Sequence, residues 1–170
     1  MLKTFIRGAV APGAALFTLA LFAAPASAAT VSGSLPVSAT VTANCTLSTS
    51  ALAFGNVNTI SGSNVDGTGG LSIVCTNGTA WSAAAGVGAG SGASFAARRM
   101  SAGANLLNYN LYTSAAYSSV WGDGTASTAT ITGTGTGATQ SVTVYGRVAS
   151  GQTSVPAGSY ADTVAITVTY

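Results

Sequence analysis

Few residues in this chain have side chains that could carry out chemistry. The 170 residues include two cysteines, three acidic residues and no histidine. Catalysis needs groups that exchange protons or attack electrophiles. After residue 28 the candidates are Ser, Thr and Tyr hydroxyls with Asp66, Asp123 and Asp162. Asp66 and Asp123 lie in glycine-rich segments typical of turns, Asp162 precedes the last predicted strand, and nothing brings two carboxylates together. We therefore interpret all three as structural and do not expect an enzyme.

The two cysteines, Cys45 and Cys75, favour a covalent cross-link over metal binding. An even cysteine count in an exported protein is typical of a disulfide. A bridge between them would close a loop of about 30 residues, worth roughly 3 to 4 kcal/mol in the chain-entropy account. Zinc needs more ligands than two cysteines without histidine supply. The sequence thus predicts one disulfide, no metal site and no cofactor.

The first 28 residues have the pattern of a secretory signal peptide. Lys3 and Arg7 are followed by an apolar stretch over residues 8–24 and by the small-residue sequence Ala26-Ser27-Ala28. A membrane anchor is the alternative, and the short apolar stretch with its adjacent cleavage site disfavours it. No other segment approaches the about 18 apolar residues of a membrane span. We expect a mature chain that begins near Ala29 and is exported.

The mature chain has almost no charge. Arg98, Arg99 and Arg147 balance the three aspartates, so its net charge is zero. Binding to nucleic acid requires a basic surface, and none is present. A near-zero charge promotes association, which suits a protein whose task is to assemble. Arg98 and Arg99 are either an ordinary solvated pair or include a partner of Asp123, and the sequence leaves this open.

Alternation of apolar and polar residues runs through most of the mature chain and indicates strands. Glycine-rich segments at residues 61–64, 66–70, 77–78 and 122–124 indicate turns, and residues 86–92 and 133–137 are expected to be flexible connections. Many short strands with glycine-rich turns predict a β-sandwich. The predicted strands cover residues 35–43, 45–47, 71–75, 107–112, 142–148 and 164–170.

The alternating run of residues 31–47 is longer than one ordinary strand. It belongs either to the domain's own sheet or to a free extension that becomes a strand in another molecule. Dividing the run near Asn44 gives an N-terminal extension, residues 29–43, followed by a sandwich domain, residues 44–170. We favour this division.

Short motifs along the whole mature chain resemble the spore coat protein U domain family, which includes the Csu-type subunits of archaic chaperone–usher pili. Their order and spacing together carry the resemblance, which covers residues 31–170. The motifs are Asn44-Cys45, Phe54-Gly55, residues 74–79, Arg98-Arg99-Met100, residues 107–112, Trp121-Gly122-Asp123, residues 144–147 and residues 156–164.

The resemblance implies an incomplete immunoglobulin-like sandwich that lacks one strand and is completed by donor-strand complementation. A periplasmic chaperone first lends a strand, and at the outer-membrane usher the extension of the next subunit replaces it. The chaperone is expected to contact the C-terminal strand through Val164, Ile166, Val168 and Tyr170. The inward residues of the donor strand are expected to be Leu35, Val37, Ala39 and Val41.

Two residues of the predicted donor strand depart from an ideal donor. Pro36 has no N–H group and would lose a bond in a ladder that needed it. Ala39 underfills a pocket meant for a larger side chain. Either could weaken strand exchange, unless the groove of the acceptor has adapted to them.

The expected function is a structural subunit of an extracellular pilus, exported through the periplasm to the cell surface and active in adhesion and biofilm formation. Its partners are the chaperone, the usher and other copies of itself or related pilins, with no nucleic acid and no membrane span. The alternatives are a spore-coat structural protein and a carbohydrate-binding adhesin module. The last would use Trp81 or Trp121, for which core packing is the simpler interpretation.

Overall fold

The computed structural model describes residues 26–170, so the predicted signal peptide lies, up to residue 25, outside the described residues. The chain divides into one unit that ends at Ala39 and a second that runs from Thr40 to Tyr170. In the described part of the first unit, residues 26–39 form neither helix nor strand. The side chains of Val31, Leu35 and Val37 are 99%, 85% and 86% exposed, although all three are apolar.

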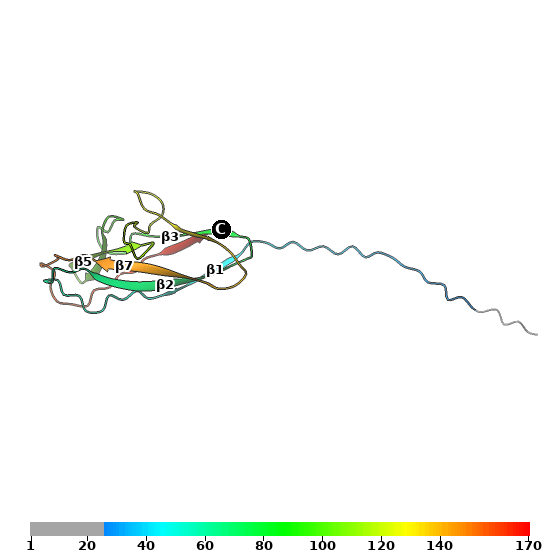
Figure 1. Ribbon diagram of the computed structural model, residues 1–170, viewed down its shortest axis with the longest axis horizontal. Coiled ribbons are helices and arrows are strands. Elements are labelled where there is room, and N and C mark those ends of the chain that lie inside the picture. The colour runs from blue at the N-terminus through cyan, green and yellow to red at the C-terminus, as the bar shows by residue number, and fades with distance from the viewer. Residues whose placement is uncertain (1–25) are drawn as a thin grey trace, which may run out of the picture. The chain divides into compact units, whose positions relative to one another are not determined.

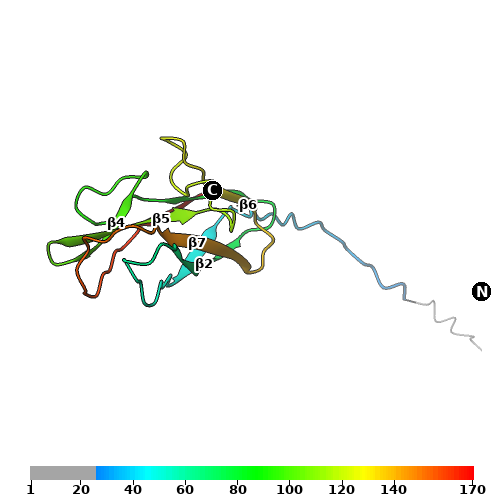
Figure 2. The same ribbon diagram turned by 60° about the vertical axis from the view of Figure 1, so that its left-hand side comes forward.

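The second unit is built from antiparallel strands, and residues 26–170 contain no helix. Two sheets are formed, with strand orders β1-β2-β7-β5-β4 and β6-β3-β8, and Figures 1 and 2 show β2 and β7 running side by side. The predicted all-β class is therefore confirmed. The strands are β1 (Cys45–Ser50), β2 (Val65–Cys75), β3 (Ala80–Ala85), β4 (Arg98–Ala102), β5 (Asn105–Tyr112), β6 (Ile131–Thr134), β7 (Gln140–Val148) and β8 (Ile166–Thr169).

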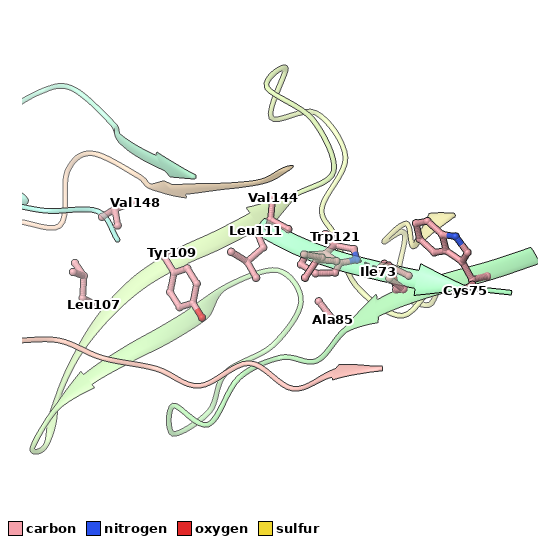
Figure 3. Close-up of a cluster of buried hydrophobic side chains, with 12 residues drawn as sticks. Ile73, Cys75, Ala85, Leu107, Tyr109, Leu111, Trp121, Val144 and Val148 are labelled. Carbon is pink, nitrogen blue, oxygen red and sulfur yellow. Dashed lines mark hydrogen bonds between the residues drawn. The ribbon is translucent and has the colours of Figure 1, made fainter. Parts of the chain in front are cut away.

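The core lies between the two sheets, as alternation along the strands requires. In β5 the side chains of Leu107, Tyr109 and Leu111 are buried, and in β3 those of Trp81, Ala83 and Ala85. Figure 3 shows Tyr109, Leu111, Trp121 and Ile73 lying in one cluster. The buried hydrophobic residues within residues 26–170 are Leu71, Ile73, Cys75, Trp81, Ala83, Ala85, Leu107, Tyr109, Leu111, Trp121, Val144 and Val148.

The expected disulfide joins the start of β1 to the end of β2. Cys45 and Cys75 are register partners in the two strands, with their sulfur atoms 2.04 Å apart. β1 is an edge strand, and the bridge fixes it to the sheet directly after residues 40–44.

Two glycine-rich segments expected to be turns or connections belong instead to strands. Residues 66–70 lie within β2, and Gly133 lies within β6. In each case a large side chain occupies the place where a Cβ atom would be. Leu52 and Phe54 approach Gly67 and Leu52 approaches Gly69, whereas the Trp81 ring packs against Gly133. These glycines allow a neighbouring side chain to pack closely against a strand, so the prediction of turns or connections at these positions is wrong.

We predict that replacing both cysteines by serine (C45S/C75S) lowers the free energy of unfolding by about 3 to 4 kcal/mol, because the 30-residue separation is no longer closed in the unfolded chain. Urea unfolding followed by the fluorescence of the buried Trp81 and Trp121 measures this. A reducing agent should lower the stability of the unsubstituted chain to the same value and leave the variant unchanged. Equal stability of the oxidised chain and the variant would contradict the assignment.

Candidate functional site

A groove of about 1170 Å³ opens into the core of the second unit. Its floor includes the buried side chains of Leu107, Tyr109, Leu111, Trp121 and Val144. Residues 49–60 form what we call the first wall, and residues 155–164 with Ile166 form the second wall. Pockets for small molecules are usually about 300 to 1,000 Å³. The groove therefore exceeds the usual size of such a pocket and is bounded by two lengths of chain.

The first wall begins in β1, but beyond Ser50 it no longer pairs with β2. After Ser50 the chain passes over Gly67, Gly69 and Gly146, where Leu52 and Phe54 pack against the sheet. We find no backbone–backbone hydrogen bond for residues 51–57. Unpaired N–H and C=O groups along an extended segment are available to another strand.

The second wall is bonded along one side only. The N–H and C=O of Ala161 both bond to Ser101, and the C=O of Ala165 accepts from the N–H of Gly86. Exposure alternates from residue 160 to 168, with the even-numbered side chains turned inward. In an extended chain successive backbone groups point in opposite directions. The N–H and C=O groups of Asp162 and Val164 therefore point away from β3 and β4.

Asp162 is a polar side chain among the apolar inward residues of the second wall. Its Oδ2 accepts a hydrogen bond of 2.6 Å from the Tyr109 hydroxyl, and its Oδ1 accepts from the N–H groups of Ala89 and Thr163, each at 2.7 Å. Gly88, at φ +91°, has no Cβ atom, and a Cβ atom at this position would collide with the carboxylate of Asp162. Burial raises the pKa of Tyr109 well above its ordinary value, and the hydrogen bond to Asp162 raises it further. These contacts fix the second wall to β5 and to the loop after β3.

Arg98 is completely buried, contrary to the two alternatives left open by the sequence. Its guanidinium donates to Gly86 O at 2.9 Å, Asn110 Oδ1 at 2.6 Å and Trp121 O at 2.6 Å. Burial lowers the pKa of Arg98. The partner suggested for this pair, Asp123, instead accepts from Thr125. Arg98 thus connects β4 to the loop after β3 and to Trp121, which lines the groove.

Asp66 is also placed differently from the prediction, because it lies in β2 and pairs with Arg147 of β7. Two hydrogen bonds of 2.7 and 2.8 Å join the carboxylate to the guanidinium. The guanidinium also lies over the Tyr117 ring, 3.7 Å from its centroid. The hydrogen bonds from Arg147 lower the pKa of Asp66.

Neither tryptophan proposed for carbohydrate binding presents its ring to solvent. Trp121 is 1% exposed and donates from Nε1 to Ala83 O, and Trp81 is 5% exposed. Core packing is therefore the correct interpretation for both. Within residues 26–170 no group of three or more His, Cys, Asp or Glu side chains comes together, and no helix has the length and hydropathy of a membrane span.

The predicted site residues take these positions. Leu35 and Val37 are exposed in the first unit, and Val41 is 84% exposed in the second. Val164 lies in the second wall, while Ile166 and Val168 belong to β8, which begins two residues later than predicted. Sequence reasoning missed the first wall and the inward Asp162. Two signals in the sequence were available. The alternation of Leu52 and Phe54 indicates the first wall, and Asp162 shares the parity of Tyr160 and Val164, which indicates that it points inward.

A two-sheet sandwich with one open groove and one disulfide is the class of fold defined by these observations. The chain belongs to the Spore Coat Protein U domain family, whose model matches residues 31–167. Protein U of Myxococcus xanthus is 37% identical over 180 residues, covering 97% of this chain and 98% of that protein.

A solved structure shares the fold. It is the CsuC–CsuE chaperone–tip adhesion subunit pre-assembly complex from archaic chaperone–usher Csu pili of Acinetobacter baumannii, with a TM-score of 0.50 and 19% identity. The alignment covers 77% of this chain and 40% of that chain. This confirms the predicted resemblance in architecture.

We predict that Arg98→Met lowers the free energy of unfolding by on the order of 3 kcal/mol, because buried acceptors lose their donor. Chemical denaturation measures the loss. Arg99→Met is the matched control, since Arg99 has one hydrogen bond, to Ser91 O in an exposed setting, and should change stability by about 0.5 kcal/mol or less. Equal effects of the two substitutions would contradict the role given to Arg98.

We predict that Asp66→Asn removes part of the acid sensitivity of the fold. The lowered pKa of Asp66 in the folded chain means that its contribution is present above the ordinary Asp pKa of about 4 and is lost as the pH falls through the folded value. Stability measured between about pH 2 and 5 should vary less in the variant, most clearly at low salt. Thr68→Ala, on the same strand, should keep the original slope. An unchanged slope in Asp66→Asn would refute the prediction.

Proposed function

We propose that this protein is a structural subunit of an extracellular chaperone–usher fibre, and that its groove is filled by the N-terminal extension of the next copy. The observation that carries the proposal is the groove with two backbone walls that have free hydrogen-bonding sides. An occupant that is itself an extended strand would satisfy both walls at once. A small molecule would leave most of these backbone groups unpaired.

The extension has the properties that the groove requires. Residues 29–43 alternate between apolar and small polar residues, and their apolar members are exposed in the described chain. Burying Leu35, Val37 and Val41 would contribute roughly 5 to 8 kcal/mol from apolar area. Ordering the extension opposes this, so the figure is an upper bound. Main-chain hydrogen bonds to the walls add to it.

The same groove explains why partners are needed before assembly. An exposed core and unpaired edges favour aggregation. A periplasmic chaperone that contacts the C-terminal strand at Val164, Ile166, Val168 and Tyr170, followed by an outer-membrane usher, would protect the groove until the next extension arrives. The complex of CsuC with CsuE, which shares the fold, supports a chaperone partner. The chain would then be exported to the cell surface, with a structural role in adhesion and biofilm formation and no catalytic role.

An extracellular coat protein is the second candidate. It is favoured by the family's description and by the similarity to Protein U along nearly the whole chain. Strand exchange through the groove would serve a coat as well as a fibre. Electron microscopy of producing cells separates the two, since a fibre subunit gives thin surface fibres and a coat protein gives a continuous layer.

We predict that deleting residues 30–43 leaves a chain that still binds the chaperone but does not polymerise, because the groove remains while the donor strand is lost. Co-purification and size-exclusion chromatography measure the two properties. Replacing the inward Leu35 and Val37 by serine should reduce polymerisation in the same way. The outward substitutions Ser38→Ala and Thr40→Ala are the matched controls and should polymerise normally. Normal assembly of the deletion variant would refute strand exchange.

A further inference from the structure

The second wall offers hydrogen bonds to an incoming strand at alternate residues only. Ala161 and Ala165 direct their backbone groups toward β4 and the loop after β3. Asp162 and Val164 alternate with these residues, so their backbone N–H and C=O groups point toward the groove side of the wall. Their side chains are turned inward. In antiparallel pairing, directly opposite residues share a face. An inward donor residue must therefore lie opposite one of the even-numbered, inward residues from 160 to 166.

Asp162 is the position that discriminates among donor residues. Its carboxylate is held by Tyr109, Ala89 and Thr163 and fits against Gly88, so it has little freedom to turn away. A large apolar side chain opposite would cover the carboxylate without offering it a donor, which is unfavourable. A small residue leaves this arrangement intact. Val164 and Ile166 have no such restriction.

Among the four residues predicted to be inward in the donor strand, Leu35, Val37, Ala39 and Val41, only Ala39 is small; Gly33 and Ala43 share their parity but lie outside this set. Resting on the proposed function, we propose that Asp162 sets the register of strand exchange by selecting Ala39 as the residue opposite it. The alignment then pairs Val37 with Val164, Leu35 with Ile166 and Val41 with Tyr160. A shift of two residues in either direction would place Val37 or Val41 against the carboxylate.

The same register accommodates Pro36, which has no N–H group. Pro36 falls opposite Ala165, whose C=O is bonded to Gly86, so no hydrogen bond between these two residues is required. The backbone of Pro36 then faces the first wall instead of the free groups of the second wall. A parallel donor would instead direct Pro36 at the free groups of the second wall. Pro36 is thus compatible with this antiparallel register, because the register requires no hydrogen bond from Pro36 to the second wall.

Disulfide trapping between copies reads the register directly. Outward residues Ser38 and Thr163 lie opposite each other in the proposed alignment, at a non-hydrogen-bonded position where Cα atoms are about 4.5 Å apart. The full mature chain carrying S38C/T163C should therefore assemble into a reducible ladder on a non-reducing gel. T40C/T163C and P36C/T163C, shifted by two residues in opposite directions, are the matched controls and should give about tenfold less ladder, because diagonal neighbours lie about 7–8 Å apart.

The outcomes separate the register from the proposed function. A ladder strongest in either control, or assembly without cross-links in all three variants, overturns the register while leaving strand exchange in place. Failure of the unsubstituted chain to assemble overturns the proposed function itself. Cross-linked monomers in S38C/T163C would show each extension filling its own groove, which also contradicts exchange.

Selection by Asp162 has its own test. Ala39→Leu should slow assembly by about tenfold, the effect of covering a polar group, whereas Val37→Leu should leave the rate nearly unchanged. Assembly is followed by light scattering after release from the chaperone. Equal rates for the two variants would overturn the selection of a small residue.

Discussion

The unpaired backbone groups along the groove are the constraint on which the rest of this structure depends. Residues 51–57 have no backbone partner, and the second wall is bonded on one side only. A core that includes Leu107, Leu111 and Trp121 lies beneath them. In water such groups either bind solvent, with the core partly open, or pair with another strand and close it. The hydrogen bonds of the buried Arg98 and of the Asp162 carboxylate fix elements that border this opening.

The supports of the groove are unusual because they are polar in a chain with few charges. Arg98 joins β4 to Gly86 and to Trp121, and Asp162 joins the second wall to Tyr109. Apolar packing alone is non-directional, and a sandwich without one strand could collapse to close the gap. The hydrogen bonds of Asp162 fix the second wall at a defined position, which gives an incoming strand a preformed edge to pair with.

Much of the fold was predictable from the sequence. Alternation of apolar and polar residues identifies the inward face of β5, β7 and the C-terminal segment, and two cysteines in an exported chain indicate one disulfide. The errors came from residues whose role depends on a distant partner. Gly67 and Gly133 read as turn residues, yet Leu52 and Trp81 pack against them in strands. For Arg98 the sequence left open a solvated pair or a partner of Asp123, and neither is correct, since nothing local shows that the carbonyls of Gly86 and Trp121 converge on it. The groove itself could be anticipated only through the family resemblance.

Hydrogen exchange at the free side of the second wall tests the central claim most directly. The amides of Val164 and Ile166 would be followed in the chain that lacks residues 30–43, which has no donor strand of its own, alone and with an excess of a synthetic peptide of residues 31–41. The account predicts strong added protection of Val164 with the peptide, and none with a peptide in which Leu35, Val37 and Val41 are serine. Protection of Val164 that is already complete without the peptide, or unchanged by it, would contradict an open groove filled by this segment.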